Sequence, residues 1–181
     1  MFDLSKQQAL SKLDKSKKGY IDEEILPLIT ALNKKKNFYT TSSCAGRIVL
    51  LELRGKKKHD AHWIFCSHKK AEGIESEISE YPVWFRYDPP IIHLSCRTLE
   101  DAKIFLEIAK NAGFKHTGII SLGRIMVELI GYDKIATLVS RDGKPLVDKE
   151  YLNILTELAN ECMERNRLRL QALYESLDRL T

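Results

Sequence analysis

A run of short hydroxyl and thiol side chains in the first third of the chain is well suited to chemistry. Residues Thr40–Cys44 carry five such side chains in a row, and Gly46, Arg47 and an apolar strand follow them. We predict a turn over residues 40–47 whose backbone N–H groups, hydroxyls and fixed positive charge suit an anionic or carboxylate-bearing ligand. The alternative is an ordinary Ser/Thr-rich turn with an ion-paired arginine.

A second candidate site is the sequence His93-Leu-Ser95-Cys-Arg97. Because alternate residues of a β-strand share a face, an imidazole, a hydroxyl and a guanidinium would stand together on one side of this strand. Such a set suits a proton transfer beside an anion. The alternative is a histidine that is hydrogen-bonded within a half-buried sheet.

A third group contains metal-ligating residue types: His59, His62, Cys66 and His68. His59 lies in a lysine-rich loop, and a strand lacks the helical i,i+4 spacing that would preset a pair of ligands. We therefore expect no metal. The glycine-rich phosphate loops GxGxxG and GxxxxGK[ST] are also absent, which argues against a standard dinucleotide or NTP enzyme.

Hydrophobic periodicity predicts the elements that position these residues. An N-terminal helix should end near residues 18–19, and a second helix should start from Asp22 as N-cap and reach Leu32. Further helices are predicted over 72–81 and 99–112, and a long one at the C-terminus. Strands are predicted over 48–51, 62–68, 83–87, 91–97, 117–122, 125–130 and 134–140.

These elements predict an α+β fold, in a single domain over residues 1–181, with a mixed or largely antiparallel sheet covered by helices. Short glycine-containing connections between the last three strands favour antiparallel hairpins. The C-terminal helix should cover the sheet with one stripe: Leu152, Leu155, Ala159, Cys162, Asn166, Leu170, Leu173, Leu177 and Leu180. An alternative is that this stripe pairs with another chain.

The composition is that of an ordinary globular protein with one substantial core: 181 residues, 44% hydrophobic and 30% charged. No apolar run approaches the roughly 20 residues of a membrane span and no signal peptide is apparent, so we expect a cytoplasmic protein. The four cysteines form no CxxC pair, which favours free, mostly buried thiols. The net charge is +4, and the lysine clusters lie in the first 70 residues. If they converge, they could bind phosphates; otherwise they are solvated loop ends.

Several segments together resemble a known family, the methyltransferases that act in wybutosine synthesis on phenylalanine tRNA, and specifically its archaeal members. The most specific is Phe38-Tyr-Thr-Thr-Ser-Ser-Cys-Ala-Gly-Arg-Ile48, and the block Ile92-His-Leu-Ser-Cys-Arg97 also matches. Shorter matches are Leu10-Ser-Lys, Lys18-Gly-x-Ile-Asp22, Ser67-His-Lys69, Asp101-Ala102, Gly113-Phe-Lys-x-Thr-Gly-Ile119, Glu150-Tyr-Leu and Leu158-Ala-Asn160. The similarity covers most of the chain.

The resemblance implies an S-adenosylmethionine-dependent enzyme that methylates the N4 ring nitrogen of a 4-demethylwyosine-type guanosine 3′ to the anticodon. It also implies a fold outside the usual doubly wound methyltransferases. His93 would be the base that removes the proton of the acceptor nitrogen, or the residue that orients the tricycle, with Ser42 beside it. The turn formed by Ser43, Gly46 and Arg47 would hold either the methionine carboxylate of the cofactor or a tRNA phosphate.

The partner that follows is the anticodon arm of phenylalanine tRNA, bound by a protein that we expect to be a monomer. Tyr39 would stack on a splayed base, and Arg97 and Lys69 would contact the RNA. The lysine clusters and the C-terminal arginines would position the arm through its phosphates. A rival hypothesis is a non-catalytic RNA-binding module, which would bind RNA without affinity for S-adenosylmethionine.

Overall fold

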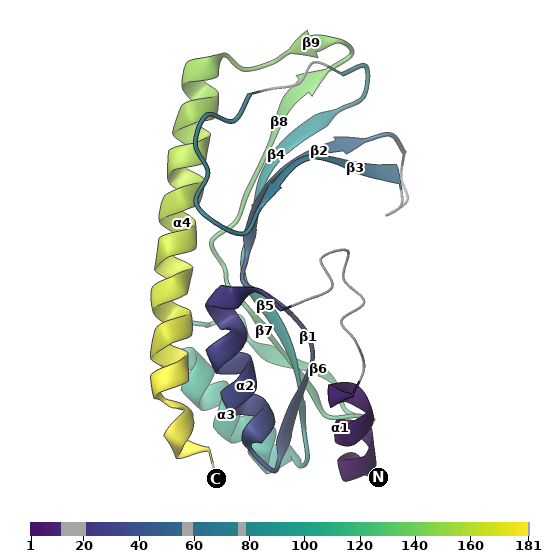
Figure 1. Cartoon of the computed structure of the whole chain (residues 1–181), viewed down its shortest axis with the longest axis vertical. Coiled ribbons are helices and arrows are strands. Elements are labelled where there is room, and N and C mark those ends of the chain that lie inside the picture. The colour runs from purple at the N-terminus through teal and green to yellow at the C-terminus, as the bar shows by residue number, and fades with distance from the viewer. Residues whose placement is uncertain (12–20, 56–59, 76–78, 181) are drawn as a thin grey trace. The chain divides into compact units, whose positions relative to one another are not determined.

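The computed structural model describes residues 1–11, 21–55, 60–75 and 79–180 (Figure 1). These residues divide into two compact units. The first unit comprises Met1–Ala45, Pro90–Tyr132 and Asn166–Thr181, and the second comprises Gly46–Pro89 and Asp133–Arg165. Each unit has one sheet and its own cluster of buried apolar residues. The long helix α4 (Lys149–Glu175) begins in the second unit and ends in the first.

The first unit is built on a four-stranded antiparallel sheet in the order β1-β5-β7-β6. Its strands are β1 (Phe38–Cys44), β5 (Ile91–Cys96), β6 (Gly118–Ser121) and β7 (Met126–Ile130). The short helix η1 (Glu23–Ile25) leads into α2 (Leu26–Lys34), which packs with α3 (Leu99–Asn111) and the end of α4 over one face of this sheet. The small helix α1 (Phe2–Leu10) contacts β1 instead. Figure 1 shows α2 and α3 side by side, with α1 apart from them.

Strand alternation separates the two faces of this sheet. Ile92 and Leu94 of β5 and Val127 of β7 are completely buried in the core under the helices. Their neighbours His93 and Glu128 therefore project from the opposite face. The small helix α1 contacts this side of β1 through Phe2 and Tyr39, and Ser42, farther along the strand, is exposed.

The second unit contains a five-stranded antiparallel sheet in the order β3-β2-β4-β8-β9. Its strands are β2 (Arg47–Leu53), β3 (Ala61–Ser67), β4 (Val83–Asp88), β8 (Ile135–Arg141) and β9 (Lys144–Pro145). The beginning of α4 covers this sheet, and its apolar side chains join those of β2 and β4 in the core. The strand predicted over 48–51 is β2, and all four of these residues are buried.

The sequence predictions of an α+β fold, largely antiparallel pairing and a long C-terminal helix are confirmed. All nine positions of the predicted stripe are buried, so the stripe packs within the chain. The helix ends at Glu175, and Leu177 and Leu180 continue the stripe from the short helix η3 (Leu177–Arg179) and just beyond it. The single-domain assignment stays a prediction, because compactness does not decide whether either unit folds alone.

Four other predictions were wrong. One sheet and one core were expected, and the strands form two sheets with two cores. Residues Thr40–Cys44 of the turn predicted over 40–47 are part of strand β1, because β5 pairs with all of them except Thr41. The hairpin expected between the strands at 125–130 and 134–140 does not form: β7 pairs with β5, and β8 pairs with β4.

The fourth is the helix over residues 72–81, where the described residues form no helix and Gly73 has a φ of 61°. Asp22 does precede a helical turn, η1, but its side chain makes no cap hydrogen bond there. Its carboxylate accepts a hydrogen bond from the backbone of Ala45 instead. The predicted end of the N-terminal helix, near residues 18–19, lies outside the described residues.

Candidate active site

A chain of hydrogen bonds crosses the open face of the first sheet. Ser42 on β1, His93 on β5 and Glu128 on β7 stand side by side, because the register pairs Ser42 with His93 and His93 with Glu128. The Ser42 Oγ lies 2.8 Å from His93 Nδ1, and the opposite ring nitrogen, Nε2, lies 2.8 Å from a carboxylate oxygen of Glu128. Three adjacent strands thus contribute one residue each.

The partners of His93 determine which ring nitrogen carries the proton in the neutral imidazole. An ionised carboxylate can only accept, so Nε2 donates to Glu128 and Nδ1 remains free to accept from the Ser42 hydroxyl. The side chains of His93 and Glu128 are 29% and 32% exposed, so the pair is accessible to a ligand while partly shielded from water. The hydroxyl of Ser42, on an exposed residue, keeps lone pairs that can accept from a substrate.

Local features of β1 place Ser42 in this position. The pairing with β5 shifts by one residue between Thr40 and Ser42, which is a β-bulge at Thr41. The end of the strand is anchored where the buried Asp22 accepts a hydrogen bond of 2.8 Å from the backbone N–H of Ala45. Without the bulge, strand alternation would direct Ser42 away from the face that His93 occupies.

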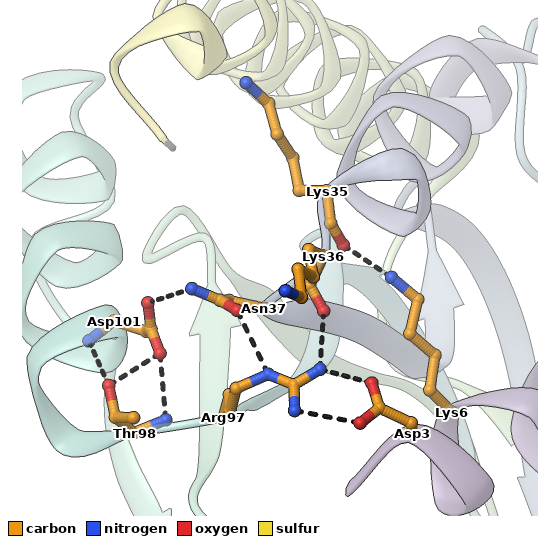
Figure 2. Close-up of polar contacts among 8 residues, drawn as sticks. All are labelled: Asp3, Lys6, Lys35, Lys36, Asn37, Arg97, Thr98 and Asp101. Carbon is orange, nitrogen blue, oxygen red and sulfur yellow. Dashed lines mark hydrogen bonds and ion pairs between the residues drawn. The ribbon is translucent and has the colours of Figure 1, made fainter.

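A second polar group surrounds Arg97, directly after β5 (Figure 2). Its Nε donates to Asn37 Oδ1 at 3.0 Å, and its two terminal nitrogens donate to both carboxylate oxygens of Asp3. This hydrogen bonding lowers the pKa of the Asp3 carboxyl and raises the pKa of Arg97. The guanidinium also lies over the ring of Phe2, 4.4 Å from its centroid. His93, Ser95 and Arg97 follow one face of β5 as predicted, but Ser95 is completely buried.

Tyr39, which was predicted to stack on a base, is covered by α1 in this structure. The Tyr39 side chain is 1% exposed, and its ring packs edge-on against Phe2 of α1 at 5.1 Å between centroids. A base cannot reach the face of this ring while α1 lies there. The sequence did not show that α1 covers this residue, and the stacking role of Tyr39 stays a prediction.

Arg47 belongs to the second unit, where it is held by two neighbours. Its Nε donates to a carboxylate oxygen of Asp88 at 3.2 Å, and its guanidinium lies 4.3 Å from the centroid of the Trp63 ring. Asp88 is also paired with Arg86 at 2.6 Å. The result is a half-buried guanidinium, 30% exposed, fixed against an aromatic ring. This suits the recognition of a carboxylate or a phosphate.

The other predicted ligand-binding residues belong to different units, and one of them lies on the opposite face of its sheet from Ser42. Ser43 pairs with Ile92 and therefore points away from the face that carries Ser42. Gly46 begins the second unit and has a φ of 94°, a backbone conformation that favours glycine. Lys69 is exposed in the second unit, where its backbone forms a small turn with the hydroxyl of Ser67.

Several basic side chains expected to contact RNA are engaged within the chain. Lys70 pairs with Glu164 at 3.1 Å, and Lys35 donates to the carbonyl of Leu180. The C-terminal arginines have acidic or polar neighbours as well: Arg165 with Asp133 and Glu161, Arg167 with Glu24, and Arg169 with Asn166 and Tyr132. Convergence of the lysine clusters stays a prediction, because residues 15–18 and 56–58 lie outside the described part of the chain.

The four cysteines form no disulfide, and only Cys96 and Cys162 are buried as predicted; Cys66 is exposed and Cys44 half-buried. Burial raises the pKa of the Cys96 thiol to about 12. Of the residues considered as metal ligands, His59 lies outside the described residues and His62 stands 3.8 Å from Glu52. Among the described residues, no helix combines the length and the apolar character that crossing a bilayer requires.

Sequence reasoning missed Glu128 as part of the candidate site. It is a single charged residue inside the apolar strand Met126-Val-Glu-Leu-Ile130, and such a residue needs a partner or an exposed face. That signal was present in the sequence. The identity of its partner was not, because it depends on β7 pairing with β5 in a particular register.

Comparisons with known proteins find similar chains over nearly the whole length of this one. A family model described as "Methyltransferase TYW3" matches residues 4–179. A Pyrococcus horikoshii protein named tRNA(Phe) 7-((3-amino-3-carboxypropyl)-4-demethylwyosine(37)-N(4))-methyltransferase 1 is 33% identical, over 99% of this chain and 96% of that protein. A Bos taurus protein named tRNA wybutosine-synthesizing protein 3 homolog is 34% identical, over 95% of this chain and 70% of that protein.

Solved structures are similar over nearly the whole chain as well. The structure of the PH1069 protein from Pyrococcus horikoshii OT3 has a TM-score of 0.88 at 33% identity, and the match covers 99% of this chain and 95% of that one. A hypothetical protein from Aeropyrum pernix has a TM-score of 0.73 at 25% identity, covering 88% and 99% of the two chains.

Proposed function

Because the chain belongs to the methyltransferase TYW3 family, we propose that it methylates the tricyclic guanosine 3′ to the anticodon of phenylalanine tRNA. The methyl group goes from S-adenosylmethionine to the N4 ring nitrogen of a 4-demethylwyosine-type base. The names of the archaeal relatives, which this chain matches over nearly their full length, support this substrate. The observation that carries the proposal within this chain is the Ser42–His93–Glu128 hydrogen-bond chain.

The reaction requires a proton acceptor at the substrate. The acceptor nitrogen must lose its proton as it forms the new bond to carbon, and the group that takes this proton must lie within hydrogen-bond reach. S-adenosylmethionine supplies the methyl group as a sulfonium, whose carbon–sulfur bond breaks with the electron pair going to sulfur. No covalent enzyme intermediate is needed, so the protein's task is to align the nitrogen and remove its proton.

Ser42 and His93 can perform that task together. The Ser42 hydroxyl donates to His93 Nδ1, so its lone pairs can accept the N–H of the substrate. As the nitrogen attacks, its proton moves to the Ser42 oxygen while the hydroxyl proton moves to Nδ1. The carboxylate of Glu128 accepts from Nε2 throughout and stabilises the imidazolium that results. Glu128 is thus a positioning and charge-stabilising residue, and His93 is the base.

Arg47, in the second unit, is suited to bind an oxyanion. Its guanidinium is fixed by Asp88 and Trp63, so little side-chain entropy is lost when it binds a ligand. The chemistry of this donor fits the methionine carboxylate of the cofactor and equally a tRNA phosphate. The neighbouring Gly46 and the more distant Ser43 are proposed to take part in cofactor binding, as their place in the family motif implies. Lys69 and Arg97 are proposed as RNA-binding residues.

The direct test is incubation of the protein with labelled S-adenosylmethionine and tRNA that carries the demethylated precursor, followed by mass analysis of the nucleosides. The expected product is the precursor nucleoside plus one methyl group, on N4. Unmodified tRNA transcript should give no product. Binding of RNA with no affinity for S-adenosylmethionine and no methyl transfer would overturn the proposal in favour of a non-catalytic RNA-binding module.

A further inference from the structure

The guanidinium of Arg97 is held in place from the side of the sheet and α3. Its Nε donates to Asn37, whose own amide nitrogen donates to Asp101 at 2.9 Å. Asp101 in turn accepts from the backbone and the hydroxyl of Thr98, in the capping box at the start of α3. Figure 2 shows this row of contacts leading from the helix cap to Arg97. None of these contacts involves α1.

The outer edge of Arg97 faces α1 and binds it as a fork. Its two terminal nitrogens donate to the two carboxylate oxygens of Asp3, and its central carbon lies over the Phe2 ring. A carboxylate and a flat ring next to each other resemble the two parts of a nucleotide. A phosphate accepts the same two-pronged donor, and an unpaired base stacks on an arginine plane or an aromatic ring in the same way.

Helix α1 is attached mainly by these polar and ring contacts. None of its residues is buried, and the side chain of Asp3 is 74% exposed. Lys6 donates to the backbone carbonyl of Lys35, which adds one further contact. An exposed ion pair of this kind is worth little in water, so a ligand that offers the same groups can compete with it.

The surface next to Phe2 has the chemistry of a binding site. Tyr39 presents an aromatic ring to Phe2, at 5.1 Å between centroids. Ser95 is the cross-strand partner of Tyr39 and lies on the face of β5 that also carries His93. The Ser95 hydroxyl is completely buried and has no hydrogen-bond partner among the described residues. A buried unpaired hydroxyl is costly in a purely structural region.

We propose that Arg97 and Tyr39 form a subsite for one nucleotide of the substrate RNA, which α1 occupies in the free protein. Asp3 stands where a backbone phosphate binds, and Phe2 stands where an unpaired base packs between the guanidinium and the edge-on tyrosine ring. Binding of RNA at this subsite displaces α1. In this arrangement the stacking role of Tyr39 is restored only after α1 has moved.

This inference rests on the proposed function, because it assumes that the bound RNA is a tRNA anticodon arm. It concerns binding alone, so it can be measured without S-adenosylmethionine. A protein that fails to methylate can still show competition between α1 and RNA, and a protein that methylates can fail to show it. The two proposals therefore fail separately.

The test is fluorescence anisotropy of a labelled phenylalanine-tRNA anticodon stem-loop with the full chain. Asp3→Asn removes the internal competitor and should tighten RNA binding roughly two- to fivefold, the range of one exposed ion pair. Arg97→Lys keeps the charge but loses the fork and should weaken binding. When Arg97→Lys is already present, adding Asp3→Asn should not tighten RNA binding. In an Arg97→Ala protein, the slope of log K for RNA binding against log salt concentration should be smaller in magnitude by about one.

The matched control is Glu100→Gln, which removes one exposed carboxylate of α3 that lies beside Lys103. It changes the net charge by the same amount as Asp3→Asn without freeing Arg97. If the two variants change RNA affinity equally, the effect is general electrostatics and the subsite is refuted. An unchanged or weaker affinity in Asp3→Asn refutes it as well.

Two further measurements identify the ligand and the movement. Calorimetry with S-adenosylmethionine should give the same affinity for Asp3→Asn and the unchanged protein. If Asp3→Asn instead binds this cofactor more tightly and its affinity for RNA is unchanged, the fork binds a carboxylate ligand, and the RNA subsite would be rejected. Amide hydrogen exchange across residues 2–10 should become faster when RNA is bound; slower or equal exchange would contradict displacement of α1.

Discussion

Glu128 on β7 and His93 on β5 are cross-strand neighbours whose carboxylate oxygen and Nε2 lie 2.8 Å apart. This pair fixes the neutral tautomer of His93 and leaves Nδ1 for the Ser42 hydroxyl. It resembles the way in which a carboxylate orients a histidine base in other enzymes.

Glu128→Gln should lower kcat for methylation by roughly 10- to 100-fold, the worth of one hydrogen bond to a charged group. The amide oxygen can still accept from Nε2, so the ring orientation persists while the stabilisation of the imidazolium is lost. KM for tRNA should change little. His93→Ala should lower kcat for methylation by about 10²- to 10⁴-fold, as expected for the loss of a general base. Single-turnover methylation assays measure the rates of the two variants.

The matched control for this pair is Glu107→Gln, which removes an exposed carboxylate from α3. Its rate should equal that of the unchanged protein. Full activity in His93→Ala would remove the base assignment, and full activity in Glu128→Gln would remove the charge-stabilising role.

Arg47→Lys should weaken the binding of one anionic ligand by about tenfold or more, because the lysine keeps a charge but loses the fork and the contact with Trp63. Calorimetry with S-adenosylmethionine and with tRNA separates the two candidates. A loss with the cofactor assigns Arg47 to its carboxylate, and a loss with tRNA assigns it to a phosphate. Arg86→Lys, which alters another partner of Asp88, is the control. If neither affinity changes, both roles are wrong.

Cys66 should react with iodoacetamide at pH 8 long before Cys96. Cys66 is exposed, whereas burial raises the pKa of Cys96 to about 12 from an ordinary 9.0 and removes its thiolate. The folded protein thus binds this proton more tightly than the unfolded chain. The stabilisation is complete below pH 9 and is lost as the pH rises from 9 toward 12. Peptide mass analysis checks the alkylation, with the unfolded chain as control; early labelling of Cys96 would contradict its burial.

Ser95→Ala should raise the free energy of unfolding by about 1 kcal/mol, because it removes a buried hydroxyl that has no partner among the described residues. Thr156→Val provides the contrast. The Thr156 hydroxyl is buried too, but it donates to the carbonyl of Leu152 at 2.8 Å, so its loss should destabilise the fold by about the same amount. Urea unfolding measures both. A loss of stability in Ser95→Ala would show that this hydroxyl has a structural partner.

Features set by local periodicity were predictable from the sequence. All seven positions of the predicted stripe that lie in α4 are buried, since a repeat of three and four residues fixes one helical face whatever it packs against. The shared face of His93 and Arg97 follows in the same way from the two-residue period of β5. The family motif around Ser42 was equally readable, because a motif is a property of the chain alone.

Features set by pairing between distant segments required the tertiary structure. Glu128 joins His93 only because β7 pairs with β5 in one register, and a shift of one residue would place it on the other face. Residues 40–44 of the turn expected over 40–47 form a strand because β5, about 50 residues later, supplies their hydrogen bonds. Tyr39 is covered because α1 lies on it. The sequence by itself determined most of the elements, their faces and the family. The tertiary structure decided which faces meet, because residue types fix local geometry while contact partners depend on how the whole chain packs.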